Sequence, residues 1–197
     1  MSLVVPEDVV TTANNIMASE WLYLVAFMSN VIMMLVGLFL PLVSYVVLKT
    51  VDKKNSALFT ILLLISVPIM CINLVSQFAA LLLVRDAGYL TAFGSDQLYS
   101  LVNLFLELEE IGYAVAKIFF GIWLLPLGYL VYKSGYFPKI LGILLVIACF
   151  GYLIDFSTFF LFPSIYESIS MLVVLPIMIG EMAFTFWLLL KGAKIPG

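Results

Sequence analysis

Three ionisable residues inside apolar stretches of the chain are the first candidates for chemistry. Lys117, Asp155 and Glu181 are each flanked by hydrophobic residues. A charged side chain in hydrocarbon costs several kcal/mol, so such a residue usually has a partner, a ligand or both. We therefore treat all three as candidate ligand-binding residues, and a fixed lysine among them suits an anionic or amphiphilic ligand.

Lys117 and Asp155 are expected at the same depth in the membrane. Counting at about 1.5 Å per residue from Tyr132 and from Ile140 places Lys117 and Asp155 both about 22 Å from the inner boundary. Equal depth on consecutive antiparallel helices predicts a Lys117–Asp155 ion pair. Glu110 precedes Lys117 by seven residues on the same helix face and is the alternative partner.

Further polar side chains fall in the same outer part of the predicted helices. Asn73 and Gln77 share a helix face, Asn30 reaches a similar height, and Glu181 lies nearer the midplane, about 14 Å from the inner end of its helix. With Glu110 they predict a polar pocket that opens to the outside and is closed below by Leu, Ile and Phe. Polar side chains also join membrane helices, so a structural role is the alternative for the three amides.

The residue content argues against catalysis. The chain has no histidine, which excludes His-based zinc sites, haem ligation by histidine and a histidine-dependent triad. Cys71 and Cys149 lie in apolar runs, where a thiol usually packs as a small hydrophobe. The acidic run that contains Glu107 and Glu110 fits a solvated helix end or a cation-gathering vestibule better than acid–base chemistry. We predict no catalytic residue, metal or cofactor, and a net charge of −3 gives no footprint for nucleic acid.

The composition indicates a membrane protein. Hydrophobic residues make up 64% of the 197 positions and charged residues 11%, whereas a soluble domain has about 25% charged residues. Apolar segments long enough to span a bilayer as helices occupy residues 21–48, 56–84, 102–132, 140–162 and 169–190. The sequence therefore predicts an all-α, polytopic transmembrane helix bundle in which residues 1–197 form one domain.

Lysines predict the orientation of the bundle. Alternate connections hold most of the basic residues, namely Lys49, Lys53, Lys54, Lys133, Lys139, Lys191 and Lys194. The other connections are mainly acidic. Because positively charged loops stay in the cytoplasm, we predict that the N-terminus lies outside and the C-terminus inside.

The residues before Trp21 predict a short amphipathic helix. Pro6, Glu7 and Asp8 are typical of a first helical turn. One face then carries Val9, Ala13, Ile16 and Met17. This helix would lie on the outer membrane interface or cap the bundle, and a disordered tail is the alternative.

Two stretches resemble a known family. The first is Thr12-Ala13-Asn14-Asn15-Ile16, followed by Ser19-Glu20-Trp21-Leu22, and the second, over residues 121–142, is GIWLLPLGYLVYKSGYFPKILG. Both are similar to the uncharacterised bacterial membrane family called domain of unknown function 4386. The resemblance implies a multi-pass protein of the bacterial inner (plasma) membrane and no particular activity. Similar proteins usually have another hydrophobic helix before the first stretch, so we expect a shortened form or a five-helix variant.

Two functions follow as hypotheses. The first is a carrier or binding protein for a small molecule, a lipid or an ion, built around the polar pocket. Five helices are few for alternating access, which makes a homo-oligomer one arrangement for transport. The second is a structural or regulatory membrane protein that acts through helix contacts and binds no ligand. The lipid bilayer is the partner that both hypotheses share.

Overall fold

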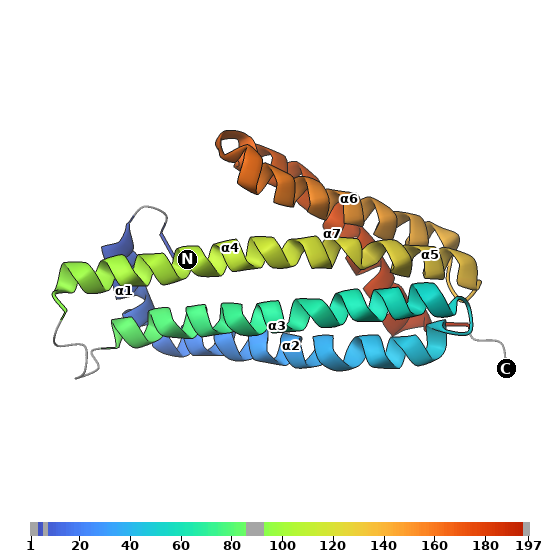
Figure 1. The fold of residues 1–197 in the computed structure, drawn as a ribbon, viewed down its shortest axis with the longest axis horizontal. Coiled ribbons are helices and arrows are strands. Elements are labelled where there is room, and N and C mark those ends of the chain that lie inside the picture. Colours follow the sequence, from blue (N-terminus) through green and yellow to red (C-terminus); the bar gives the residue numbers. More distant parts are fainter. Residues whose placement is uncertain (1–3, 6–7, 86–92, 195–197) are drawn as a thin grey trace. The chain divides into compact units, whose positions relative to one another are not determined.

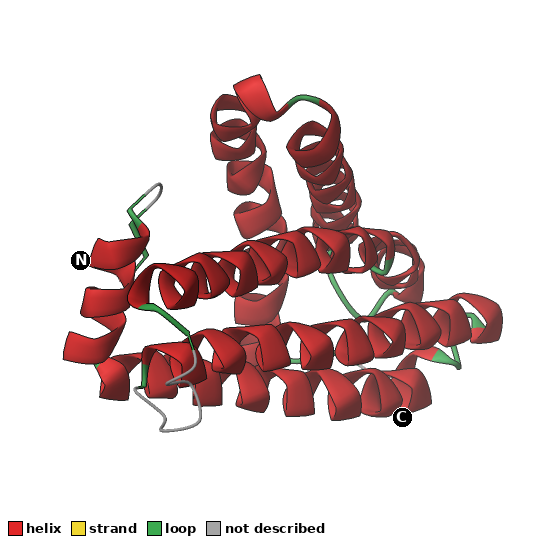
Figure 2. Cartoon of the chain, turned by 60° about the vertical axis from the view of Figure 1, so that its left-hand side comes forward, coloured by secondary structure: helices red, strands yellow, loops and turns green. Residues whose placement is uncertain are grey.

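The computed structural model describes residues 4–5, 8–85 and 93–194, and the structured elements among them are helices (Figures 1 and 2). They are α1 (Val9–Ala18), α2 (Glu20–Leu48), α3 (Lys53–Val84), α4 (Ser95–Ile122), α5 (Leu124–Ser134), α6 (Lys139–Leu161), the short 3₁₀ helix η2 (Pro163–Ile165) and α7 (Tyr166–Lys191). The predicted all-α fold is confirmed.

Five helical segments are long and apolar enough to cross a membrane, which indicates a multi-pass membrane protein. They are α2, α3, α4 continuing into α5, α6, and η2 continuing into α7. Large apolar side chains remain exposed along them, for example Val43 at 66% and Leu175 at 61%. Lipid is the medium that such surfaces match.

The third span begins earlier than its apolar run predicts. The Gln97 side chain accepts a hydrogen bond from the backbone N–H of Gly94 (3.0 Å), while the Gly94 carbonyl accepts from the N–H of Gln97. This reciprocal arrangement resembles a capping box and starts α4 at Ser95. The same span is interrupted at Trp123, between α4 and α5. Pro126 explains the interruption because it cannot donate to the carbonyl four residues earlier.

The described chain divides into two compact units. Unit 1 consists of residues 1–36 and 68–113, and unit 2 consists of residues 37–67 and 114–197. The helices α2, α3 and α4 each contribute residues to both. The prediction of a single domain over residues 1–197 stays a prediction.

Helix α1 packs on α2 and α3 within unit 1. Ile16 is fully buried in a cluster with Tyr23 and Leu81. The helix begins after Asp8, whose carboxylate accepts from the Thr11 hydroxyl (2.6 Å) and backbone N–H (2.9 Å); these bonds, the hydroxyl first, lower the pKa of Asp8. The predicted N-terminal helix is thus confirmed, whereas its proposed first-turn residues Pro6 and Glu7 lie outside the described residues.

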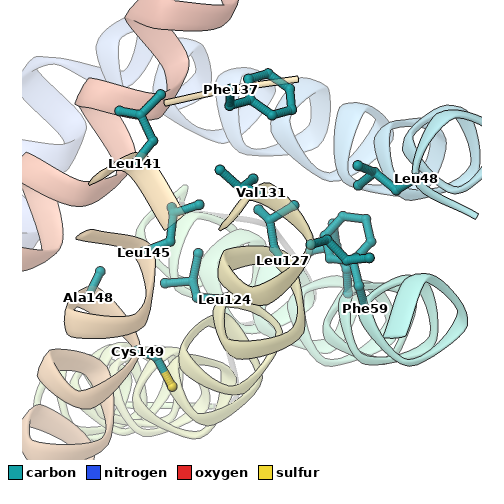
Figure 3. Close-up of a cluster of buried hydrophobic side chains, with 12 residues drawn as sticks. Leu48, Phe59, Leu124, Leu127, Val131, Phe137, Leu141, Leu145, Ala148 and Cys149 are labelled. Carbon is teal, nitrogen blue, oxygen red and sulfur yellow. The ribbon is translucent and has the colours of Figure 1, made fainter. Parts of the chain in front are cut away.

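Unit 2 is built on an apolar core around α5. Its buried residues include Leu48, Phe59, Leu127, Val131 and Leu145, and Figure 3 shows their side chains gathered between the helices. Helices α5 and α6 approach closely at two glycines. A Cβ atom at Gly142 would lie 2.5 Å from the Gly128 carbonyl oxygen, so only glycine permits this packing.

Three lysine-bearing connections meet at one end of unit 2. Lys133 forms an ion pair with Asp52 (Nζ to Oδ2, 3.5 Å). The hydroxyls of Thr50 and Tyr136 lie 3.1 Å apart, and the Lys194 N–H donates to the Tyr136 carbonyl (3.1 Å). Alternate connections therefore share one end, as the lysine pattern requires. Which side of the membrane this end faces stays a prediction.

Candidate functional site

A polar cavity of about 820 Å³ lies within unit 1. Four of the predicted site residues, Asn30, Asn73, Gln77 and Glu110, line it. The rest of the lining consists of Val4, Val5, Thr12, Met70, Leu74, Asn103, Leu106, Glu107, Glu109 and Tyr113. A volume of this size is typical of small-molecule sites, which span about 300–1,000 Å³.

Helices α2 and α3 hold one amide group in the cavity wall. The Asn30 side-chain nitrogen donates to the Gln77 side-chain oxygen (3.2 Å). The Tyr23 hydroxyl of α2 donates to the backbone carbonyl of Gln77 in α3 (2.8 Å). Both bonds fix the position of Gln77, which is 7% exposed. Among the described residues, its amide nitrogen has no acceptor, so this donor is available to a ligand.

Asn73 is a largely buried polar side chain of the cavity lining that has no hydrogen-bond partner among the described residues. It is 7% exposed. Its side-chain oxygen lies against Gly112 of α4, where no room remains for a Cβ atom. The polar atoms of Asn73 are not among the fully buried, unsatisfied atoms of the described residues, so water or a bound molecule in the cavity can supply their hydrogen bonds.

Helix α4 supplies carboxylates to the lining of the same cavity. Glu107 accepts a hydrogen bond from the Asn103 side chain (2.7 Å). The half-buried Glu109 and the exposed Glu110 have no hydrogen-bond donor among the described residues, and no lysine or arginine occurs in the described lining. Such a wall favours a positively charged occupant.

Sequence reasoning missed part of this cavity. It read the acidic run of Glu107, Glu109 and Glu110 as a solvated helix end or a cation-gathering vestibule and named only Glu110 as a site residue, whereas all three line the cavity. The spacing of Asn103 and Glu107 by four residues already places those two on one face. Sequence reasoning also missed Thr12, whose hydroxyl exchanges hydrogen bonds with the Val5 backbone. No local pattern reveals that the N-terminal segment completes the wall, because that depends on how α1 packs.

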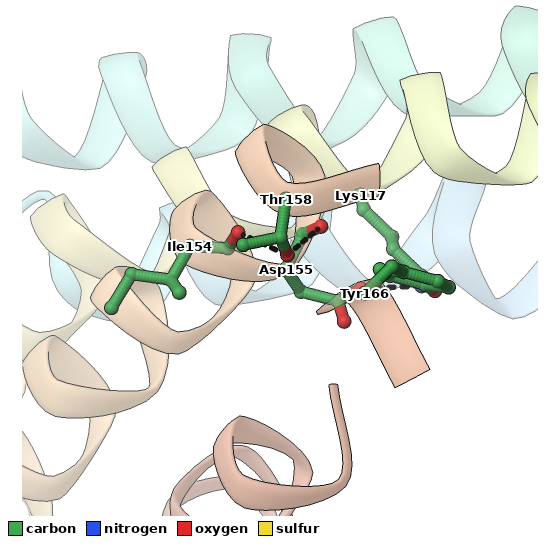
Figure 4. Close-up of polar contacts among 5 residues, drawn as sticks. All are labelled: Lys117, Ile154, Asp155, Thr158 and Tyr166. Carbon is green, nitrogen blue, oxygen red and sulfur yellow. Dashed lines mark hydrogen bonds and ion pairs between the residues drawn. The ribbon is translucent and has the colours of Figure 1, made fainter. Parts of the chain in front are cut away.

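The Lys117–Asp155 ion pair predicted from equal depths is confirmed in unit 2. Nζ of Lys117 lies 2.5 Å from Oδ2 of Asp155, and the two side chains are 16% and 3% exposed. Nζ also donates to the Tyr166 hydroxyl (3.2 Å). Figure 4 shows Lys117 reaching from α4 toward Asp155 on α6 and Tyr166 at the start of α7. Tyr166 was not foreseen.

Glu181 lines a second, mainly apolar cavity in unit 2. Its Oε1 atom accepts a hydrogen bond from the Tyr152 hydroxyl (3.1 Å). The structure thus groups the predicted residues into an amide and carboxylate set in unit 1, an ion pair in unit 2 and a separate carboxylate in unit 2. One pocket that contains all seven residues stays a prediction.

A metal ion is a poor match for these side chains. Among the described residues, no group of three or more His, Cys, Asp or Glu side chains could hold a metal ion. The carboxylates of Glu107, Glu109 and Glu110 therefore form no such group. Carboxylates spread along a wall suit a molecule whose positive charges are also spread.

Comparison with known proteins gives a family. The family described as "Domain of unknown function (DUF4386)" matches residues 1–192. An "Uncharacterized protein" of the archaeon Archaeoglobus fulgidus is 42% identical over 104 residues, which are 50% of this chain and 56% of that protein. The match thus spans little more than half of that relative, and no solved structure is similar. The chain belongs to the DUF4386 family, as the two motif stretches predicted.

Proposed function

We propose that this DUF4386 protein is a multi-pass membrane protein that binds a small organic cation in the cavity of unit 1. The observation that carries the proposal is the lining: carboxylates of α4 and the largely buried Asn73 amide of α3 line one cavity, and the described lining contains no basic side chain. A wall of one sign raises the local concentration of molecules of the opposite sign.

The amides add hydrogen-bonding capacity for a protonated amine. The Asn73 oxygen is free to accept, and the carboxylates of Glu109 and Glu110 accept as well. Leu74 and Leu106 supply apolar surface between these groups. This combination of separated acceptors and apolar patches fits a linear amine with several charges joined by methylene groups.

The orientation completes the proposal. With the N-terminus outside, Glu110 falls about 33 Å from the inner boundary, at the outer headgroup level. The cavity would then take its ligand from outside the cell, across a plasma membrane. Binding is the minimal activity, and movement of the ligand through the protein would require a second step.

Spermidine is a suitable probe for this cavity. Protein in lipid nanodiscs is incubated with radiolabelled spermidine at low ionic strength, and N1,N8-diacetylspermidine serves as the analogue with fewer charges. We expect saturable binding of spermidine, at least about tenfold weaker binding of the analogue, and a similar loss in Glu109→Gln. Asp96→Asn is the matched control, because it removes a carboxylate from the same helix outside the cavity.

Absence of saturable binding would overturn the proposal, as would equal losses in Glu109→Gln and Asp96→Asn. The second candidate is a structural or regulatory protein without a ligand. The hydrogen bonds from Asn30 and Tyr23 to Gln77 favour it, because they join α2 to α3. On that account Asn30→Leu would lower the melting temperature, and spermidine would bind neither protein.

A further inference from the structure

The second cavity differs in chemistry from the cavity of unit 1. It encloses about 470 Å³ within unit 2. Its walls include two pairs of aromatic rings, Phe59 with Trp123 (centroids 5.6 Å apart) and Phe137 with Phe184 (5.5 Å). Apart from Glu181, the polar part of the lining is limited to the Ser44 and Thr185 hydroxyls and the Trp123 indole.

Glu181 is the charged group of this cavity. Tyr152 donates to Oε1, and Oε2 has no hydrogen-bond donor among the described residues. A carboxylate in apolar surroundings is unfavourable unless a cation or a donor reaches it. The described lining offers no lysine or arginine for this purpose. Oε2 is therefore available to a donor that a ligand brings.

The cavity is accessible from the apolar surface of the protein. Leu40 and Val43 of α2 and Leu188 of α7 belong to its lining and are also exposed, by 40–66%. These residues lie on membrane-spanning helices, where exposed apolar side chains face acyl chains. An occupant would therefore enter from the lipid and bring an apolar body with it.

We infer that this cavity binds an amphiphilic amine, with its apolar body between the aromatic rings and its ammonium group at Oε2 of Glu181. The site is independent of the cavity in unit 1, because it uses other residues and draws its ligand from the bilayer. Its volume falls within the range of about 300–1,000 Å³ that is usual for small-molecule sites.

Bromine quenching of tryptophan fluorescence tests this site, because it requires contact and Trp123 lines the cavity. The chain has three tryptophans, so a Trp21→Phe, Trp187→Phe background leaves Trp123 as the emitter. The probes are 12-bromododecylamine, 12-bromododecanol and 12-bromododecanoate, titrated into protein in nanodiscs. We expect saturable quenching by the amine at concentrations at least about tenfold below those of the other two.

Glu181→Gln should abolish the preference for the amine while quenching by the alcohol persists. Glu167→Gln is the matched control, since it removes a carboxylate from the same helix outside the cavity, and it should retain the preference. Equal quenching by all three probes in the Trp123 background overturns the inference, even where Glu181→Gln does not fold. An equal effect of Glu167→Gln overturns it too, because it would indicate surface attraction.

Discussion

Nζ of Lys117 lies 2.5 Å from Oδ2 of Asp155, on helices that follow one another in the chain. The second oxygen of Asp155 is buried and has no hydrogen-bond partner in the described part of the structure. Removing Lys117 would leave this buried carboxylate without the side-chain partner that the structure shows for it. The pair therefore contributes to stability mainly through the cost of breaking it.

Lys117→Met is expected to destabilise the protein by roughly 3–5 kcal/mol, because it leaves Asp155 buried and uncompensated. Asp155→Leu in the same chain should recover most of that loss, since no charge then remains to desolvate. Denaturant unfolding in detergent micelles measures both free energies. Equal stability of the single and double variants would show that the ion pair is not the relevant interaction.

Gly112→Ala is expected to weaken spermidine binding by about tenfold. The new methyl group would clash with the Asn73 side-chain oxygen at its present position. The Asn73 side chain would therefore have to move. Gly37→Ala is the control, because its Cβ atom would meet Val67 at an ordinary 3.9 Å. Unchanged binding in Gly112→Ala, with the protein folded, would remove Asn73 from the site.

The stability of the first turn of α3 should depend on pH through the charge of Asp52. The Asn55 N–H, followed by the Asn55 side chain and Lys133, lowers the pKa of the Asp52 carboxyl below its ordinary 3.8. Its stabilising effect is therefore complete well above that pH and is lost as the pH falls through the lower folded pKa. The variant Asp52→Asn keeps a side chain that can cap the helix, but this side chain has no charge to titrate.

Melting temperatures of the parent protein and Asp52→Asn, measured in detergent from about pH 6 to about pH 3, check this expectation. The parent should be the more stable protein at the upper end, and the difference should shrink toward the lower end. A difference that stays constant over this range would contradict the role given to the Asp52 charge.

Cysteines introduced at Lys53 and Lys194 should be protected from membrane-impermeant reagents in intact cells, whereas one at Asp96 should react. Positively charged loops resist translocation, and these two lysines lie in connections that share one end of unit 2. Labelling at Lys53 or Lys194 without cell lysis would invert the orientation and move the cavity of unit 1 to the cytoplasmic side.

The sequence was sufficient for those features that depend on composition and depth. Apolar runs predicted the spanning helices, and equal counts from Tyr132 and Ile140 predicted the Lys117–Asp155 pair. The predicted start of the third span, residue 102, was wrong because the helix begins at Ser95. The apolar run begins well after Gly94 and Gln97, whose hydrogen bonds start the helix.

Features that depend on packing escaped the sequence. Thr12 reaches the cavity because α1 packs on its neighbours, and Tyr166 reaches Lys117 because α7 starts beside α6. Gly112 has no local signal for its contact with Asn73. Such contacts arise between residues far apart in the chain, where periodicity and spacing give no information.

The most direct measurement is Met70→Cys, which puts a thiol in the cavity lining one turn before Asn73 on the same helix. Its reaction rates with two methanethiosulfonates are compared, one carrying trimethylammonium and the other sulfonate. The background is Cys71→Ala, Cys149→Ala, and each rate is normalised to that of a free thiol. We predict that the cationic reagent reacts at least about tenfold faster and that spermidine slows it. Equal normalised rates, or no protection by spermidine, would contradict an acidic, ligand-binding cavity beside Asn73.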